Sequence, residues 1–193
     1  MMTRTIRILI FCLTLAFVAG INLAFAAAGA NEKVGLLTVT GTVKVNGKPA
    51  ATGDIVVSGS EIQTANGSSA VISLGDLGRV EALSSTTMRV RYEEFSTGHT
   101  SASVSVLLGD GSVRVFTVAG MDGNVETGKT SARPSTRKQE NIFTVDTRCG
   151  NTFVSVAKGK IELRAGDVLK EIAAGGQDTA GQAKPGCKPS SNL

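Results

Sequence analysis

The sequence predicts an all-β protein, and three features of its 193 residues carry that prediction. Apolar and polar residues alternate with a period of two over most of the chain after residue 33, which is typical of strands with one buried face. Glycine, asparagine or aspartate stands at most joints between these runs, where turns are expected. No stretch after residue 33 shows an apolar helical stripe longer than two turns. Short strands with aliphatic inner faces favour a β-solenoid, a β-roll or a sandwich.

The strands can be assigned in order along the chain. The first run, residues 39–45, alternates valine or glycine with threonine or lysine and ends at the turn-forming pair Asn46-Gly47. Further short strands are expected at residues 55–57, 61–64, 70–74, 79–83, 87–91, 103–108, 112–118, 142–146, 152–156, 160–163 and 168–172. A weak internal repeat relates the segments that begin at Gly41 and Gly159.

Two segments depart from the alternation. Residues 120–141 form a polar connection of about twenty residues, which is long for a compact domain and predicts a functional or mobile loop. The chain from Gly175 onward is rich in glycine, alanine and proline, so we expect it to be loosely held apart from Cys187, with residues 181–193 as a flexible tail. One β-domain is therefore expected over residues 34–180. Its core should be thin and aliphatic, because few aromatic residues and no tryptophan are present.

The N-terminal residues have the features of an export signal. Residues 1–7 are basic, residues 8–25 are almost entirely apolar, and the run ends in the small-x-small string Ala24-Phe25-Ala26. We expect cleavage after Ala26, or two or four residues later, and hence a periplasmic or secreted protein. The alternative is an uncleaved anchor, since the apolar run is long enough to span a bilayer. Membrane contact is expected only through this leader.

Export changes how the three cysteines are interpreted. Cys12 belongs to the leader and follows the bulky Phe11, where a lipidation site needs a small residue, so two cysteines remain. Because the compartment is oxidising, we expect a disulfide between Cys149 and Cys187 that contributes roughly 3–4 kcal/mol, with two free thiols as the alternative. The one histidine, His99, is distant in sequence from both cysteines, so neither a metal site nor a cofactor is expected.

The charge balance limits the classes of partner. The formal net charge is +4, from 20 basic and 16 acidic residues. Arg4 and Arg7 lie in the leader, so 18 basic and 16 acidic residues follow it, a net charge of only +2. A protein this weakly charged is not expected to bind nucleic acid.

A run of basic residues lies inside the long polar connection. Residues 129–138 contain Lys129, Arg133, Arg137 and Lys138 and no acidic residue. Such a run attracts an acidic partner protein, peptidoglycan carboxylates or lipid phosphates. We predict that these four residues contact a partner, with a solvated, mobile loop as the alternative interpretation.

One catalytic motif is matched in part, and no complete set of catalytic residues is recognisable. Residues 123–130 match the phosphate-loop pattern G-x4-G-K-[ST], but Pro134 and a serine–threonine cluster stand where a helix must follow. A hydrolase needs a nucleophile with a positioned base, or paired carboxylates, and no such set is recognisable. His99 lies in a polar stretch that reads as a hairpin tip, where we expect it to be solvated. The protein is therefore not expected to be an enzyme.

Several short motifs follow one another in a fixed order along residues 34–180. They are the ribbon at 39–49, Gly59-x-x-Ile62-x-Thr64, the apolar strand at 69–76 that ends in Leu-Gly-Asp, and the segments at 86–90, 142–147, 150–156, 159–163 and 172–175. In this order they resemble the periplasmic domain of the FecR family. The resemblance covers nearly all of the chain that follows the leader.

The resemblance implies a role in envelope signalling. FecR-like relatives are anti-sigma regulators with a cytoplasmic sigma-binding segment, a membrane helix and this periplasmic domain. Only seven residues precede the apolar run here, so we expect a stand-alone exported FecR-like domain. Its expected function is non-enzymatic contact with an envelope protein. The alternatives are a structural protein that associates with itself or with the wall, and an envelope hydrolase, which would require a partner for His99.

Overall fold

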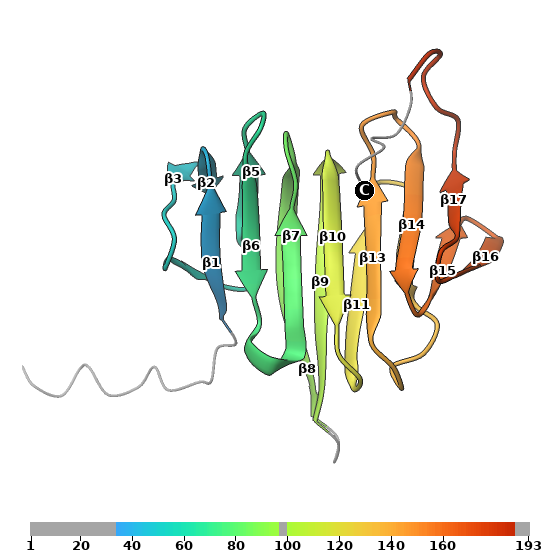
Figure 1. The fold of residues 1–193 in the computed structure, drawn as a ribbon, viewed down its shortest axis with the longest axis horizontal. Helices are drawn as coiled ribbons and strands as arrows, with labels where there is room; N and C mark the ends of the chain where they lie inside the picture. The colour runs from blue at the N-terminus through green and yellow to red at the C-terminus, as the bar shows by residue number, and fades with distance from the viewer. Residues whose placement is uncertain (1–33, 97–99, 188–193) are drawn as a thin grey trace, which may run out of the picture. The chain divides into compact units, whose positions relative to one another are not determined.

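A computed structural model describes residues 34–96 and 100–187, with side chains outside residues 93–101. The chain divides into two units, Met1–Glu32 and Lys33–Leu193, and the described residues all belong to the second. This unit is all-β, as the sequence predicts: two sheets pack on each other (Figure 1), and within the described ranges only the 3-10 turn Gly75–Leu77 is helical. No helix in these ranges is long and apolar enough to cross a membrane. The predicted leader lies outside them.

The first sheet contains eight strands and the second contains nine. From edge to edge the first is β17 (Gln177–Ala180), β14 (Thr152–Lys158), β13 (Asn141–Asp146), β10 (Ser112–Thr117), β7 (Gly78–Ala82), β6 (Ser69–Ser73), β1 (Gly35–Thr40) and β4 (Ile55–Val56). The second is β16 (Val168–Ala173), β15 (Lys160–Ala165), β12 (Thr130–Pro134), β11 (Met121–Glu126), β9 (Thr100–Asp110), β8 (Thr87–Ser96), β5 (Glu61–Thr64), β2 (Val43–Val45) and β3 (Lys48–Pro49).

The strands progress along one axis in nearly the order of the chain (Figure 1). The chain lays one or two strands in one sheet and then crosses to the other. Neighbouring strands are antiparallel except β9 and β11, which are parallel. The exception arises because β10, between them in sequence, lies in the other sheet, and the chain returns in its original direction. Of the predicted architectures, the fold is thus sandwich-like, with two mostly antiparallel sheets that both extend in nearly the order of the chain.

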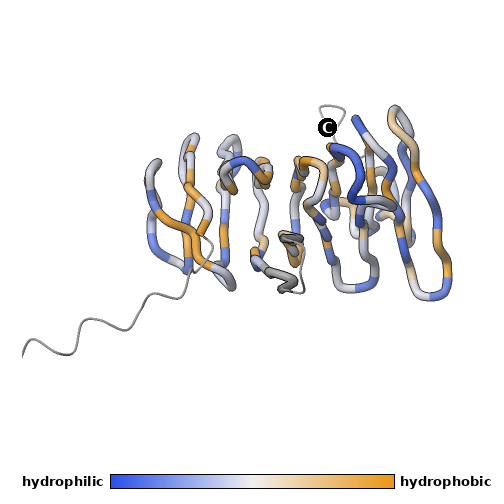
Figure 2. The backbone as a smooth tube through the Cα atoms, turned by 90° about the horizontal axis from the view of Figure 1, so that it is seen from below, coloured by the Kyte–Doolittle hydropathy of each residue, from blue (hydrophilic) through white to orange (hydrophobic). Residues whose placement is uncertain are grey.

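The period-two alternation determines which side chains are buried. On β9, Val104, Val106 and Leu108 face the core and are at most 1% exposed, whereas Ser103 and Ser105 are only partly buried. Figure 2 shows the alternation as hydrophobic and hydrophilic segments along the tube. Phe143 is the one aromatic side chain among the fully buried described residues, and the partly buried Tyr92 packs against them, so the core is mainly aliphatic.

The first predicted run divides into two strands. β1 ends at Thr40 and β2 begins at Val43, and they belong to different sheets. Gly41 has a φ of +77°, and the adjacent Thr42 N–H donates a hydrogen bond to Ser68 Oγ at 2.9 Å. The prediction of one strand over residues 39–45 was therefore wrong. The alternation continues through Gly41, but this glycine turns the chain from one sheet to the other.

The long polar connection is not a loop. Residues 120–141 contain β11 and β12, which pair with each other and extend the second sheet. Met121, Gly123 and Val125 face the core, while charged and amide side chains occupy the alternate positions. The alternation is hard to recognise in the sequence because one inward position is a glycine in place of an apolar side chain. A Cβ at this position would collide with the side chains of Val115 and Thr117.

The chain beyond Gly175 is also more ordered than expected. Residues 177–180 form β17, which pairs with β14 at one edge of the first sheet, and Ala180 is buried. Farther on, the Lys184 N–H donates a hydrogen bond to the Cys149 carbonyl at 2.9 Å. The backbone of this segment is therefore held at two points before residue 187.

Candidate functional site

Turns from both sheets gather at one end of the sandwich, which we call the turn end. It contains the β9–β10 turn at Gly111, the β11–β12 turn at residues 127–129, the β13–β14 turn at residues 147–151 and the β15–β16 turn at residues 166–167. The segment that follows β17 passes beside the same turns. Cys149, Lys129 and the last residues of the phosphate-loop string lie in this region.

The structure distributes the four predicted contact residues along β12. Lys129 lies at the turn end, Arg133 lies near the end of β12, and Arg137 and Lys138 follow in the loop to β13. β12 spans five residues at about 3.3 Å each, so Lys129 and Lys138, which flank it, lie beyond opposite ends of this strand. The four residues therefore follow the second sheet and do not form one cluster, and their contact with a partner stays a prediction.

Two of the four are engaged in ion pairs. Arg133 Nη2 lies 2.9 Å from Glu162 Oε2 on the neighbouring β15, and its side chain is 54% exposed. Arg137 Nη2 lies 2.7 Å from Asp122 Oδ2 on β11. Lys129 and Lys138 are exposed and form no ion pair with any described residue. The lysines are thus the more available charges.

The phosphate-loop string occupies a strand, a turn and a strand. Residues 123–126 lie in β11, and Thr130 begins β12, so no helix follows Lys129. The converging amides of a helix N-terminus, on which phosphate binding depends, are not formed here. Within the described ranges no group of three histidine, cysteine or acidic side chains is placed to hold a metal ion. His99 lies outside the described residues.

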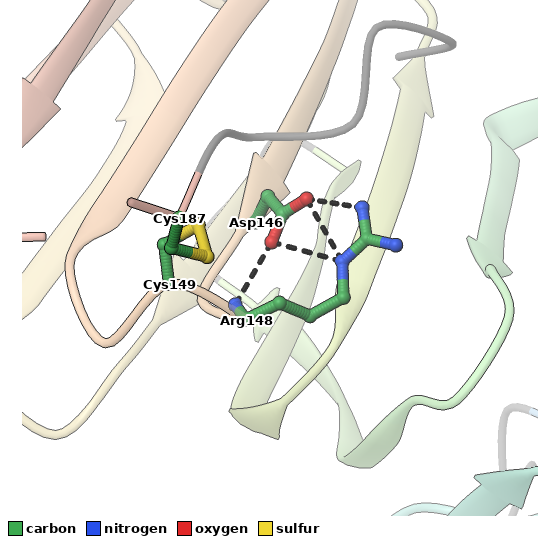
Figure 3. Close-up of a disulfide and its surroundings, with 4 residues drawn as sticks. All are labelled: Asp146, Arg148, Cys149 and Cys187. Carbon is green, nitrogen blue, oxygen red and sulfur yellow. Dashed lines mark hydrogen bonds and ion pairs between the residues drawn. A yellow bond between two sulfur atoms is a disulfide. The ribbon is translucent and has the colours of Figure 1, made fainter. Parts of the chain in front are cut away.

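A disulfide joins Cys149 to Cys187 across 38 residues, the pairing that the sequence predicts. Their Cα atoms are 5.6 Å apart, and Cys149 is 3% exposed (Figure 3). The bond fastens the chain that follows β17 to the β13–β14 turn.

Beside the disulfide lies an ion pair that sequence reasoning missed. The Asp146 side chain is 2% exposed and accepts hydrogen bonds from the Arg148 backbone N–H at 2.9 Å, from Nε at 3.0 Å and from Nη2 (Figure 3). The hydrogen bond to Asp146 raises the pKa of Arg148 further above its ordinary value. The available signal was an aspartate two residues before an arginine at a strand end.

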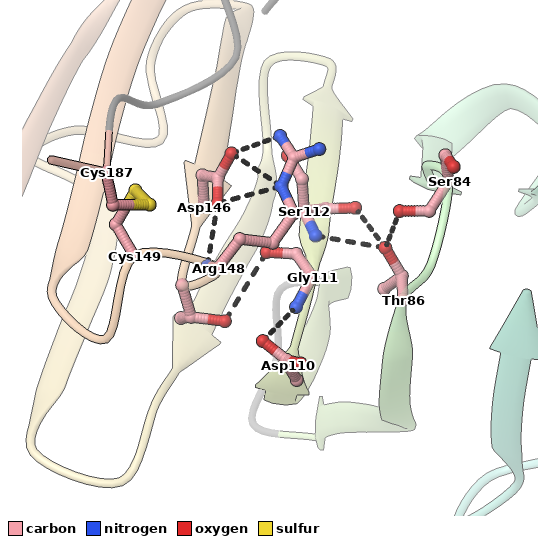
Figure 4. A network of polar contacts seen from close by, with 10 residues as sticks. Ser84, Thr86, Asp110, Gly111, Ser112, Asp146, Arg148, Cys149 and Cys187 are labelled. Carbon is pink, nitrogen blue, oxygen red and sulfur yellow. Dashed lines mark hydrogen bonds and ion pairs between the residues drawn. A yellow bond between two sulfur atoms is a disulfide. The ribbon is translucent and has the colours of Figure 1, made fainter. Parts of the chain in front are cut away.

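Further polar contacts join the neighbouring turns to this pair (Figure 4). Thr86 Oγ1 donates to the Ser112 carbonyl at 3.0 Å and accepts from the Ser112 N–H at 2.9 Å. The Thr147 N–H donates to the Gly111 carbonyl at 2.8 Å. The turn end is therefore fixed by hydrogen bonds between strands that are distant in sequence.

The outer strand β16 forms one edge of the second sheet. No described strand pairs with its far side, and Val168 and Leu169 are 56% and 52% exposed. The charged residues in the following part of β16 form ion pairs. Lys170 Nζ lies 2.8 Å from Asp178 Oδ1 on β17, and Lys160 Nζ lies 2.7 Å from Glu171 Oε1. The apolar pair at the start of β16 remains open.

The Lys170–Asp178 contact makes a testable prediction about pH. The hydrogen bond from Lys170, followed by that from the Thr179 N–H, lowers the pKa of Asp178. Because the folded-state pKa lies below the unfolded value, the contact stabilises the fold above the unfolded pKa. That contribution is lost as the pH falls through the folded pKa. We expect Lys170→Met to raise the Asp178 pKa in a carboxyl NMR titration. Lys160→Met, which removes a different pair, should leave it in place, and equal shifts in both variants would contradict the assignment.

Comparison with known proteins gives a distant and partial likeness. No family model matches the chain, and no curated protein matches it. Two crystal structures of a "putative anti-sigma factor" from Parabacteroides distasonis ATCC 8503, at 1.65 and 2.50 Å resolution, are similar to it with a TM-score of 0.47 and 21% sequence identity. The match covers 62% of this chain and 53% of each of those chains, so this protein spans about half of their length.

Proposed function

We propose that the protein is an exported, non-enzymatic module of the cell envelope that binds a protein partner along β16. The observation that carries the proposal is the open edge of the second sheet at Val168 and Leu169, where no described strand pairs. An unpaired edge offers a row of backbone N–H and C=O groups to an added strand. Exposed apolar side chains on that edge favour binding, because a partner would remove them from water.

The charges on β16 do not block the apolar part of the edge. Lysine on an edge strand ordinarily prevents association, because its charge would have to be buried. Here Lys170 is held against β17 and Glu171 is held against Lys160, so both charges are drawn away from the start of the strand. The open position is therefore the pair Val168 and Leu169.

The flanking charges favour an acidic partner. Leu169 stands opposite Arg164 in the β15–β16 register, and Arg164 is exposed and forms no ion pair with a described residue. Arg133 lies one strand further in, and Lys129 lies at the end of the same strand. Charges of this kind steer association and choose among partners more than they set affinity. We propose that Arg164 and Lys129, together with the Glu162-paired Arg133, form a basic flank beside the edge.

Export and a FecR-like role are parts of the same proposal. The basic and apolar leader with its small-x-small end supports export, and a disulfide is typical of an oxidising compartment. The ordered motifs over residues 34–180 support a FecR-like module in envelope signalling. A module of this kind would act as an adaptor.

The test places a photo-crosslinking amino acid at Leu169 in cells, with the same group at Leu107 as the matched control. Leu107 is 44% exposed but lies on β9, inside the sheet, where no strand can be added. We expect one envelope protein to be cross-linked from Leu169 and none from Leu107. With the cross-linking group kept at residue 169, Val168→Lys should abolish the product, whereas Leu107→Lys should not. Equal products from both positions would overturn the edge assignment.

The four basic residues predicted from the sequence are tested separately. Replacing Lys129, Arg133, Arg137 and Lys138 by serine should reduce capture of the cross-linked partner by about tenfold at low salt and much less at high salt, because exposed charges are screened. The melting temperature should change little, since exposed ion pairs contribute about 1 kcal/mol or less. Unchanged capture at low salt would remove these residues from the contact.

A second candidate function is self-assembly, and one observation favours it. Leu36 and Ile55 stand opposite each other in the β1–β4 register at the other end of the first sheet, and they are 55% and 62% exposed. Apolar side chains are thus exposed at both ends of the sandwich. Cross-links from Leu169 that join two copies of this chain, with concentration-dependent sedimentation, would favour self-assembly over an adaptor.

A further inference from the structure

One lysine joins β16 and β17, the edge strands at the C-terminal end of the two sheets. Lys170 Nζ on β16 lies 2.8 Å from Asp178 Oδ1 and donates a second hydrogen bond to the Thr179 carbonyl at 3.2 Å. Both of these residues belong to β17. The position of the Lys170 charge therefore depends on β17. If β17 moved away, the ammonium group would be released at the edge of the second sheet.

β17 itself is a short strand with little burial. It pairs with β14 over four residues, and no described strand pairs with its other side. Ala180 is its one buried residue. Strand ends with few buried contacts are among the segments that open at the lowest free-energy cost. The attachment of the chain that follows β17 is therefore important for keeping this strand in place.

That chain, residues 181–187, forms a strap over the β13–β14 turn. All seven residues are exposed, and none is a large aliphatic or aromatic residue. One backbone hydrogen bond joins the strap to the rest of the described chain, from the Lys184 N–H to the Cys149 carbonyl. The methylene groups of Lys184 lie over Gly150, where an added Cβ would be 3.3 Å from Cε. The Cys149–Cys187 bond is thus the strongest attachment of the strap (Figure 3).

This attachment is accessible to a reductant from one side. Cys187 is exposed, whereas Cys149 is 3% exposed. Thiol–disulfide exchange begins when a thiolate attacks one of the two sulfur atoms, and access helps to decide which one. Exposed disulfides are more readily opened than enclosed ones. We therefore expect attack at Cys187.

A dithiol opens such a bond in two exchange steps. Its first thiolate attacks the Cys187 sulfur and forms a mixed disulfide, while the Cys149 sulfur leaves as a thiolate and takes up a proton. The second thiol of the reductant then attacks the mixed disulfide and releases Cys187 as a thiol. The dithiol is oxidised to a disulfide, and two protons are gained by the two cysteines.

We propose that the Cys149–Cys187 bond is a redox latch that controls the β16 edge. When the bond is closed, the strap keeps β17 in place and β17 holds Lys170. When a dithiol opens it, the strap and β17 detach, and the Lys170 ammonium group returns to the edge, where a lysine charge opposes the addition of a strand. This inference rests on the proposed function, because it concerns access to the same edge.

The first test uses the purified protein and needs no partner. We expect dithiothreitol to increase amide hydrogen exchange in β17 by about tenfold, because the strand opens more easily without its anchor. Exchange in β4, the edge strand at the other end of the first sheet, should not change. Equal exchange of β17 in the two redox states would overturn the latch. An equal rise in β17 and β4 would show only general destabilisation and would also overturn it.

The same reduction should release Lys170. Because the hydrogen bond from Lys170 lowers the pKa of Asp178, its loss should raise that pKa in a carboxyl NMR titration. In Lys170→Met this hydrogen bond is already missing, so reduction should not move the Asp178 pKa further. An Asp178 pKa that is the same in the reduced and oxidised wild type would show that β17 keeps Lys170 and would overturn the link to β16.

The second test measures the consequence in cells, by cross-linking from residue 169. Replacing Cys149 and Cys187 by serine should lower the product by about tenfold, and adding Lys170→Met should restore it, because no charge then opposes the partner. An unchanged product in the serine variant would overturn control of the edge. Lack of rescue by Lys170→Met would attribute the loss to stability and would overturn it as well. Absence of product from the oxidised wild type would instead contradict the proposed function, and the exchange and titration results would still decide the latch.

Discussion

Replacing Cys149 and Cys187 by serine is expected to lower the free energy of unfolding by about 3–4 kcal/mol. The bond closes a loop with a sequence separation of 38 residues, and its loss frees the unfolded chain to explore more conformations. The loop holds most of the strands at the C-terminal end of both sheets, including the edges β16 and β17. For a domain of this size the melting temperature should fall by roughly 10 °C. Denaturant unfolding of the two proteins side by side measures the effect.

Reduction provides the matched control for the serine variant. Dithiothreitol should destabilise the wild-type protein by the same amount and should not affect the variant, because no other cysteine follows the leader. A variant as stable as the oxidised wild type would show that the anchored segment contributes nothing to the cooperative unit.

The second large effect is expected from Arg148→Met. This substitution leaves the carboxylate of Asp146 buried at 2% exposure without the guanidinium that satisfies it. Removing one partner of a buried pair ordinarily costs about 3–5 kcal/mol. We expect about 2–3 kcal/mol here, because a third of the Arg148 side chain reaches solvent and water can partly replace it.

Two control variants show whether the loss of stability in Arg148→Met comes from the buried ion pair. Arg91→Met removes an exposed arginine without an ion pair to a described residue, and it should change stability by about 0.5 kcal/mol or less. Arg148→Asn combined with Asp146→Asn removes both charges and should recover part of the loss, because no unpaired charge remains. If Arg148→Met and Arg91→Met were equally mild, the buried pair would not be a determinant of the fold.

The sequence predicts strands well where one face is buried without interruption. The run at 103–108 is an example: its alternation places Val104, Val106 and Leu108 in the core, and the structure confirms it. Alternation does not say when a chain changes sheets, since Gly41 preserves the pattern while turning the backbone. It also fails where an inward position is glycine, as at Gly123 on β11.

The candidate sites show a similar division. The cysteine pair is predictable by counting, because export leaves two cysteines and no competing ligand set. The hydrogen bonds among the Thr127, Thr130 and Thr152 hydroxyls are not predictable, because they join two turns of different sheets whose proximity depends on the whole topology. The basic residues were found by composition, but their ion pairs with Glu162 and Asp122 depend on strand register.

The order of strands has a consequence for how such a chain can be assembled. From β5 onward, every strand joins the free edge left by strands that precede it in sequence, and none is inserted between two earlier ones. A polypeptide released from its N-terminus can therefore extend both sheets as it emerges, without reopening what has already paired. Cys149 cannot form its disulfide while these strands are being added, because Cys187 follows it by 38 residues and comes after β17. Formation of the covalent bond thus requires a chain that extends through Cys187, beyond the last described strand.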